Sequence, residues 1–365
     1  MSLKAGIVGL PNVGKSTLFN AITKKNILVA NYPFATIEPN VGIVTVPDER
    51  LGHLEEIYIP EELKPATFEF VDIAGIVKGA SLGEGLGNKF LSHIREVDAI
   101  VEVVRCFDDK EITHVDGSVD PIRDVEVINL ELALADLEII NNRIDKIKKK
   151  AETTKEKETV LEYNALTKAK EALEKDIPLR FVDFTKDELL AIKGFNFLTL
   201  KPHIYLANIS ENEITTENDY VKKLKEYAKG ENSKVIVVSA KIESELAELE
   251  DSDKEEMLNE LGIEKSGLDK LIEESYNLLG LKTYFTCGPK EVKAWTYKNG
   301  MNAKECAGII HSDFEKGFIK AEVISYNDLI EAGSELKVKE NGKFRIEGKE
   351  YLMQDGDICH FRFNL

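Results

Sequence analysis

Apolar and polar positions follow two different patterns at the start of the chain. Residues 5–10, Ala-Gly-Ile-Val-Gly-Leu, are a short apolar run of the kind found in buried parallel strands. A glycine-rich stretch follows, and residues 16–22, Ser-Thr-Leu-Phe-Asn-Ala-Ile, place apolar side chains at helical spacing. This order predicts a strand, a tight loop and a helix that open an α/β fold.

Later apolar runs repeat the strand pattern. They cover residues 67–75, 99–105, 202–208 and 235–241. The last two runs end in polar tips, Asn-Ile-Ser-Glu and Ser-Ala-Lys, and open α/β sheets bind ligands at the carboxyl ends of their strands. We therefore predict a mostly parallel sheet with binding loops along one edge.

Residues 121–199 are charged and have a helical pattern. Two apolar stripes are formed by Leu130, Leu134, Leu137, Ile140, Ile144 and Ile147, and by Val160, Tyr163, Leu166, Leu173 and Ile177. The stripes predict a protruding antiparallel helical pair with a lysine-rich tip at residues 146–157. Such a tip is either a handle for RNA or the ribosome or a solvated helix end, and the sequence leaves both open.

The pattern changes again at residue 281, to short β-rich segments with glycine turns, which predict a small α+β domain. The only tryptophan, Trp295, lies on an alternating segment and is expected in the core rather than on a stacking surface. We expect four parts: residues 1–122 and 200–280 as the two halves of one domain, residues 123–199 as a helical coiled-coil insertion, and residues 281–365 as a C-terminal domain.

Composition narrows the possible partners and the compartment. The 365 residues carry a formal net charge of -18, which argues against a generally basic, nucleic-acid-coating surface. The four cysteines show no C-x-x-C spacing, which is typical of free thiols in a reducing compartment. The first ten residues leave no room for a signal peptide, and no apolar stretch approaches the roughly 20 residues that span a bilayer. We expect a soluble, cytoplasmic monomer without a membrane partner.

Residues 9–16, Gly-Leu-Pro-Asn-Val-Gly-Lys-Ser, match the phosphate-binding pattern G-x-x-x-x-G-K-[ST]. In such a loop the backbone N–H groups surround the phosphates, Lys15 reaches the outer phosphates and takes part in catalysis, and the Ser16 hydroxyl binds Mg²⁺. An incidental glycine turn is the alternative, but the predicted strand and helix on either side favour a nucleotide site. The predicted nucleotide contacts here are Asn12, Val13, Gly14, Lys15, Ser16 and Thr17.

Two further elements have the order expected of a switch GTPase. Residues 72–75 read D-x-x-G, so that Asp72 is expected to hold the magnesium shell and the Gly75 amide to contact the terminal phosphate. Between this element and the P-loop, residues 31–40 form a proline-punctuated loop in which Thr36 is expected to complete the Mg²⁺ coordination. Taken alone, Thr36 would be an ordinary loop threonine.

These motifs together resemble the Obg-like ATPase family, the YchF group of the TRAFAC P-loop NTPases, over essentially the whole chain. The resemblance rests on residues 9–17, 34–40, 72–81, 85–91, 208–211 and 239–241. It implies a P-loop G domain with a mostly parallel sheet, interrupted by an α-helical coiled-coil hairpin and followed by a C-terminal α+β TGS domain of ubiquitin-like type. It also implies Mg²⁺-dependent ATP hydrolysis, association with the ribosome (the large subunit or the 70S particle) and a regulatory role in translation or stress.

The predicted base-binding loops depart from those of ordinary GTPases. Those enzymes have N-K-x-D, whose aspartate accepts from guanine, whereas this chain has Ile209 and Glu211 at the lysine and aspartate positions. Asn208 is expected to serve adenine through its amide, Ile209 to pack on the base, and Ser239, Ala240 and Lys241 to supply further groups. In keeping with the family, ATP is preferred over GTP.

The catalytic group is less plain, because the position that follows D-x-x-G is Ile76 and a hydrocarbon cannot orient water. His114, in a polar loop after the strand at 99–105, is the candidate, since imidazole binds or orients water near neutral pH. The alternative is a solvent-exposed loop histidine. Asn12 is either a K⁺ ligand beside the phosphates, as in P-loop proteins with asparagine here, or a turn residue.

The sequence thus predicts a Mg²⁺-dependent ATPase. Two alternatives stay open: a GTP-dependent switch of the same architecture, and an RNA- or ribosome-binding module in which nucleotide is a slow regulatory ligand.

Overall fold

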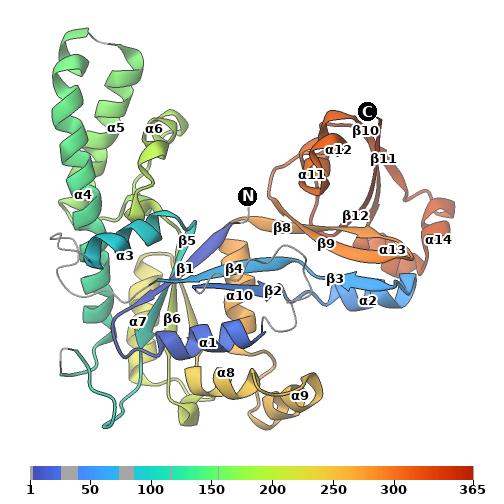
Figure 1. Ribbon diagram of the computed structural model, residues 1–365, viewed down its shortest axis with the longest axis horizontal. Helices are drawn as coiled ribbons and strands as arrows, with labels where there is room; N and C mark the ends of the chain where they lie inside the picture. The colour runs from blue at the N-terminus through green and yellow to red at the C-terminus, as the bar shows by residue number, and fades with distance from the viewer. Residues whose placement is uncertain (1–2, 26–39, 74–85, 116, 155, 365) are drawn as a thin grey trace. The chain divides into compact units, whose positions relative to one another are not determined.

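The computed structural model describes residues 3–25, 40–73, 86–115, 117–154 and 156–364 (Figure 1). The chain forms two compact units. The first consists of Met1–Gly42 and Glu69–Leu271, and the second of Ile43–Phe68 and Ile272–Leu365. The helical insertion therefore groups with the first unit, while the segment Ile43–Phe68 groups with the C-terminal part. The four domain limits expected from the sequence stay predictions.

The first unit is built on a six-stranded sheet in the order β2-β4-β1-β5-β6-β7. The strands are β1 (Lys4–Gly9), β2 (Val41–Thr45), β4 (Thr67–Asp72), β5 (Ala99–Arg105), β6 (His203–Asn208) and β7 (Lys234–Val238). The pairs β1–β4, β1–β5, β5–β6 and β6–β7 are parallel. Every residue of β5 and β6 is buried, which explains their continuous apolar runs, and the predicted α/β fold is confirmed.

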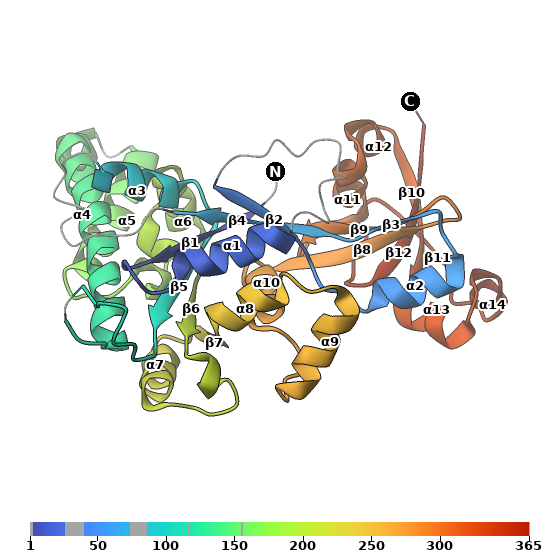
Figure 2. The same cartoon turned by 60° about the horizontal axis from the view of Figure 1, so that its bottom comes forward.

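Helices cover this sheet and extend from it. They are α1 (Lys15–Lys25), α3 (Leu86–Arg95), α4 (Pro121–Thr154), α5 (Lys157–Leu173), α6 (Lys186–Ile192), α7 (Asp219–Gly230), α8 (Ala240–Leu246), α9 (Asp251–Glu260) and α10 (Gly267–Leu278), with 3₁₀ turns at Leu179–Phe181, Lys193–Phe195, Leu198–Leu200 and Glu211–Glu213. The helices α1 and α8 lie side by side (Figure 2). On β5 and β6, Val104, Tyr205 and Ala207 pack against Val125 of α4 and Leu224 of α7.

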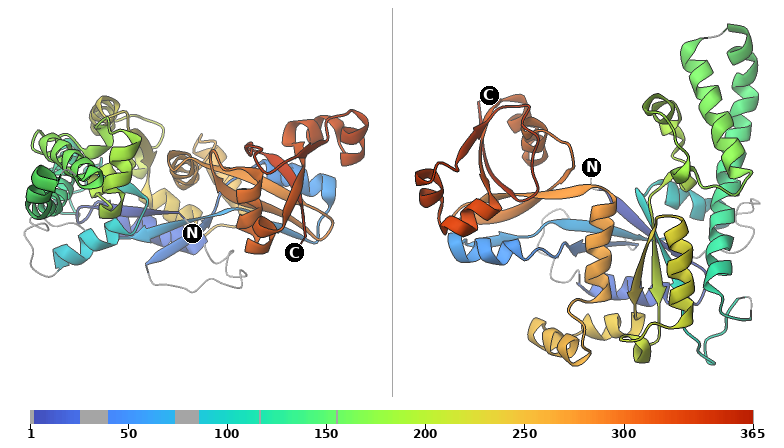
Figure 3. Two further views of the ribbon diagram at one scale, coloured as in Figure 1. Left: turned by 90° about the horizontal axis from the view of Figure 1, so that it is seen from above. Right: turned by 180° about the vertical axis from the view of Figure 1, so that it is seen from behind.

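The predicted helical pair is formed by α4 and α5, which run next to each other (Figure 3). Their shared core contains Ile140 and Ile147 from α4 and Leu166 and Leu173 from α5. The stripe predicted for α4 is wrong at its first part, where Leu130 and Leu134 are 50% and 40% exposed. The buried positions there are Val125, Ile128, Leu132 and Ala135, because the first half of α4 packs on the sheet and on α7 instead of on α5.

The second unit is a mixed sheet with short helices, as an α+β domain requires. Its strand order is β11-β10-β12-β8-β9-β3. The strands are β3 (Glu62–Lys64), β8 (Leu281–Cys287), β9 (Glu291–Lys298), β10 (Phe318–Ser325), β11 (Arg345–Glu347) and β12 (Asp357–Phe363). The helices are α2 (Arg50–Tyr58), α11 (Ala303–Ile310), α12 (Ser312–Lys316), α13 (Tyr326–Ala332) and α14 (Glu335–Glu340).

Local contacts in the second unit bear on two expectations. Trp295 packs at the edge of the core, with its ring 6.4 Å from that of Tyr284 and its Nε1 donating to the Thr286 hydroxyl over 2.8 Å. All four cysteines are free thiols, as expected. Within the described ranges, no helix combines the length and the apolar character needed to cross a membrane.

Candidate nucleotide-binding site

The loop between β1 and α1 has a backbone that few residues could adopt. Gly14 has φ +92° and Asn12 has φ +64°, both in the left-handed region that glycine and, to a smaller extent, asparagine tolerate. A Cβ on Gly14 would lie 2.2 Å from Nδ2 of Asn208, so the position also has no room for a side chain. Because α1 begins at Lys15, the first N–H groups of the helix are available to an anion at this loop.

A cleft of about 1140 Å³ opens beside this loop. Three segments far apart in the sequence line it: the P-loop, the tip of β6 and the start of α8. The predicted residues in its lining are Asn12, Gly14, Lys15, Ser16, Thr17, Asn208, Ile209, Glu211, Ser239, Ala240 and Lys241. Val13 is 1% exposed and lies beneath the surface of the loop. The fold thus brings the predicted phosphate end and the predicted base end to one cavity.

Asn208 joins the two ends of the cleft. Its Nδ2 donates to the carbonyl oxygen of Val13 over 2.8 Å, and its Oδ1 accepts from the backbone N–H of Ala240 over 2.9 Å. The residue is 3% exposed, so these contacts lie in a dry environment. Both polar atoms of the amide are therefore engaged with backbone, and the geometry supports a role in holding the loops rather than the base contact expected from the sequence.

The rest of the base end is also differently arranged from what the motif alone indicates. Ile209 is 3% exposed and belongs to the core cluster under α7, so only a small part of it reaches the cleft. The carboxylate of Glu211 forms an ion pair with Lys241, and this hydrogen bond raises the pKa of the Lys241 ammonium. Glu211 and Lys241 are partly exposed, so the pair lies at the rim.

At the phosphate end, the Lys15 ammonium forms an ion pair with the carboxylate of Asp72. The two groups meet because β1 and β4 are parallel neighbours, with Ile7 opposite Asp72. Ser16 is exposed in the first turn of α1. A hydroxyl and a carboxylate are oxygen ligands suited to Mg²⁺. Thr36 and Gly75, the other predicted members of this end, lie outside the described residues.

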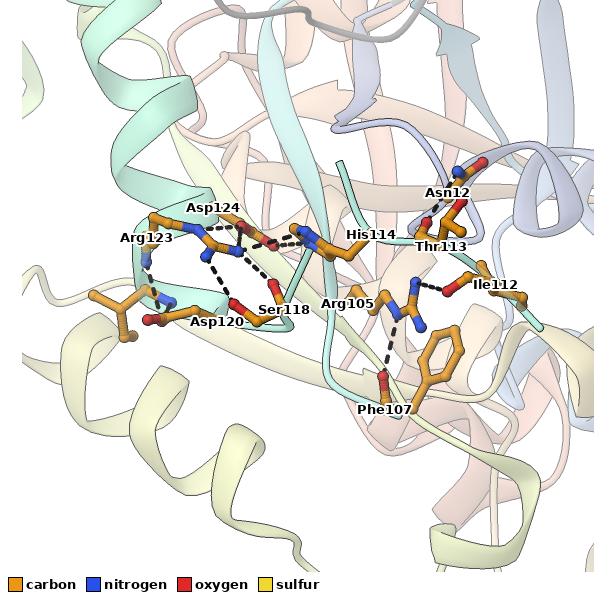
Figure 4. Close-up of polar contacts among 11 residues, drawn as sticks. Asn12, Arg105, Phe107, Ile112, Thr113, His114, Ser118, Asp120, Arg123 and Asp124 are labelled. Atoms are coloured by element: carbon orange, nitrogen blue, oxygen red, sulfur yellow. Dashed lines mark hydrogen bonds and ion pairs between the residues drawn. The ribbon is translucent and has the colours of Figure 1, made fainter. Parts of the chain in front are cut away.

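His114 takes an arrangement that neither sequence interpretation anticipated. Its side chain is 3% exposed, and Nε2 lies 2.8 Å from Oδ2 of Asp124, in the first turn of α4 (Figure 4). The expectation of a solvent-exposed histidine is therefore wrong. Asp124 is itself 2% exposed. The ring is absent from the lining of the cleft, so a catalytic role requires it to leave Asp124.

The loop after β5 supplies site residues that the sequence analysis missed. Phe107, Asp108, Asp109 and Ile112 line the cleft. The carbonyl oxygen of the next residue, Thr113, accepts from Nδ2 of Asn12 over 3.2 Å. A signal was present, because β5 is an apolar strand that ends in a polar loop, as do β6 and β7, and the carboxyl ends of parallel strands meet at one edge.

Two family descriptions match the chain. Residues 4–170 match "50S ribosome-binding GTPase", and residues 281–364 match the YchF-GTPase C-terminal family, described as "Protein of unknown function (DUF933)". Together they cover the first half of the main unit and nearly all of the predicted C-terminal domain.

Full-length relatives and a solved structure agree with these matches. The chain is 60% identical over 367 residues to the ribosome-binding ATPase YchF of Bacillus subtilis and 51% identical over 365 residues to that of Escherichia coli O157:H7, covering 100% of each pair. The YchF GTPase of Schizosaccharomyces pombe superposes with a TM-score of 0.90 at 43% identity, covering 99% of this chain and 98% of that one. With its P-loop, its parallel sheet and this full-length likeness, the chain belongs to the YchF family of P-loop NTPases, the Obg-like ATPases.

Proposed function

We propose that the chain binds Mg-ATP in this cleft, hydrolyses it, and uses the nucleotide state to regulate contacts with the ribosome. The observation that carries the proposal is the convergence of the P-loop, the tip of β6 and the start of α8 on one cavity, held together by Asn208. The relatives in Bacillus subtilis and Escherichia coli are named ribosome-binding ATPases.

The base end favours adenine over guanine. In N-K-x-D enzymes the aspartate is open to accept from guanine, whereas Glu211 here faces the Lys241 ammonium. A carboxylate already paired with a cation has less capacity to accept from guanine N1–H and N2–H₂. GTP remains the second candidate, because the Schizosaccharomyces pombe relative is titled a GTPase.

The phosphate end fits a magnesium nucleotide. Lys15 contributes a positive charge beside the outer phosphates, and the N–H groups at the start of α1 add a positive dipole end. Ser16, Asp72 and Thr36 would hold Mg²⁺, which stabilises the charge that develops on the transferred phosphoryl group. A K⁺ ion at the carbonyl oxygen of the Asn12 amide would add charge at the same place, and equal rates in K⁺ and Na⁺ buffers would exclude that part of the proposal.

His114 is the proposed group that orients the attacking water in place of a glutamine. The Asp124 carboxylate holds the ring away from the cleft, while the neighbouring Thr113 touches the P-loop through Asn12. A change in the loop after β5 would therefore bring the ring toward the phosphates and start hydrolysis.

The proposed ribosome contact uses the tip of the α4–α5 pair. Lys146, Lys148, Lys149 and Lys150 are exposed there, although Lys150 pairs with Glu156. Such a tip suits a phosphate backbone, and its contact would weaken as salt rises. We expect a cytoplasmic monomer, working where ribosomes are found, in a translation-related or stress-related regulatory role.

Two measurements on the full chain test the proposal. The purified protein should hydrolyse ATP in Mg²⁺ buffer, and Lys15→Ala should remove that activity. Pelleting with ribosomes should depend on which nucleotide is bound. Salt-dependent pelleting that ignores nucleotide and is unchanged in Lys15→Ala would instead favour the ribosome-binding module with a slow regulatory ligand.

A further inference from the structure

Arg105, the last residue of β5, is a buried cation that lacks an acidic partner. It is 1% exposed, and among the residues that the structure describes it forms no ion pair with a carboxylate. A buried charge is retained only where hydrogen bonds satisfy it, so the partners of this guanidinium indicate what it does.

Those partners are backbone carbonyls of the loop that follows the strand. Nε donates to the oxygen of Phe107 over 3.1 Å, Nη1 to that of Ile112 over 3.1 Å, and Nη2 to that of Asp109 over 3.4 Å (Figure 4). The guanidinium carbon also lies 4.6 Å from the centre of the Phe107 ring. One side chain therefore ties the outgoing limb of the loop, at Phe107, to the returning limb, at Ile112.

This loop forms one wall of the nucleotide cleft. Phe107 and Ile112, whose carbonyls Arg105 holds, both line the cavity. The loop is anchored to the P-loop where Thr113 accepts from Asn12, and to the base end where the Cys106 N–H donates to the carbonyl oxygen of Asn208 over 2.8 Å. A shift of the loop would therefore be felt at both ends of the cleft.

We propose that Arg105 is a positioning residue of the nucleotide site, which sets nucleotide affinity by fixing the loop at residues 107–113 against the cleft. This inference rests on the proposed function, since it assigns an effect to the same cavity. A guanidinium suits the task because its planar fork donates in several directions at once, whereas a lysine ammonium is a single point at the end of a flexible chain.

The test compares Arg105→Met and Arg105→Lys with a matched control, Arg180→Met. Arg180 is a second largely buried arginine, whose Nη2 donates to Glu231 over 3.0 Å, and it does not line the nucleotide cleft. The dissociation constant of the fluorescent analogue mant-ATP is measured for each folded variant, with melting temperature as the measure of stability.

We expect Arg105→Met to weaken mant-ATP binding by about tenfold or more, because several carbonyls lose a charged donor and the loop is released. Arg105→Lys should recover part of that affinity, and Arg180→Met should lower the melting temperature with unchanged affinity. Wild-type affinity in a folded Arg105→Met would overturn the proposal. If that variant does not fold, wild-type affinity in Arg105→Lys would overturn it.

Hydrogen–deuterium exchange without nucleotide separates this inference from the proposed function. The amides of residues 108–113 should exchange faster in both Arg105 variants than in the wild type and in Arg180→Met. If the wild type fails to bind mant-ATP, the proposed function fails, and the exchange rates still decide whether Arg105 fixes the loop. Unchanged exchange at those amides would overturn the inference.

Discussion

The side-chain amide of Asn208 donates to the backbone carbonyl of Val13 over 2.8 Å, across 195 positions of sequence. The other end of the same amide accepts from Ala240 over 2.9 Å, so the P-loop and the start of α8 hang on one buried side chain. The phosphate end and the base end of the cleft are therefore coupled through Asn208, and a change at either end is transmitted to the other.

Asn208→Ala should weaken ATP and GTP binding by the same factor, of about tenfold or more, because a buried carbonyl and a buried N–H both lose their partner. Competition titrations against mant-ATP give both factors. Asn302→Ala is the control, since Asn302 caps α11 in the second unit and should affect stability without changing affinity. A loss confined to ATP would show that Asn208 reads the base, contrary to the role assigned here.

Gly14→Ala should abolish nucleotide binding in a protein that still folds. The new Cβ would lie 2.2 Å from Nδ2 of Asn208, and φ +92° is unfavourable for alanine. Gly52→Ala, in α2, has nothing within 4 Å of its Cβ and serves as the neutral control. The double variant Gly14→Ala with Asn208→Ala removes the clash and keeps the backbone strain, so it should bind no better than Asn208→Ala. Wild-type affinity in Gly14→Ala would contradict the geometry of the loop.

His114→Ala should lower ATP turnover by about tenfold or more with nucleotide affinity retained, which is the range for loss of one acid–base or water-orienting group. Asp124→Asn should cost much less, because in this account Asp124 holds the ring in its resting position. Single-turnover kinetics with saturating ATP separate the chemical step from binding. Unchanged turnover in His114→Ala would remove the histidine from the mechanism.

Stability should fall as pH rises above about 6.5 because of a buried pair on neighbouring strands. Nε2 of His203 lies 2.9 Å from Oε2 of Glu102, and each side chain is 1% exposed. Burial raises the pKa of Glu102 well above and lowers the pKa of His203 well below the ordinary values, with Arg180 and Glu231 as the nearest charged influences. The folded pair therefore keeps one proton, with no net charge, over a wide range of pH.

The sign follows from the protons that the unfolded chain holds. Between about pH 4.5 and 6.5 the unfolded histidine also carries one proton, so the pair contributes no slope. Above that range the unfolded chain loses its proton and the folded pair does not, so unfolding becomes easier by about 1.4 kcal/mol per pH unit. Urea unfolding of wild type and Glu102→Gln at pH 6.5 and 8.5 measures this, and the wild type should lose more stability. Parallel curves would contradict the assignment.

Local pattern was sufficient to predict the P-loop and the parallel strands, because strand burial and glycine spacing are encoded in neighbouring residues. It failed where long-range packing decides. The buried pairing of His114 with Asp124 depends on how α4 meets the sheet, and the placement of the segment Ile43–Phe68 with the C-terminal strands depends on β3 pairing with β9. The Asn208 amide was assigned to the base because a motif names a residue and not the partners of its side chain.

Equilibrium binding of ATP and of GTP, each with Mg²⁺, tests the account most directly. Glu211→Asp combined with Ile209→Lys is measured beside the wild type, after circular dichroism has shown that it folds, because Ile209 is buried. The account predicts tighter binding of ATP than of GTP by the wild type, and a shift toward GTP in the double variant. Tighter binding of GTP by the wild type would contradict it and make the chain a GTP-dependent switch.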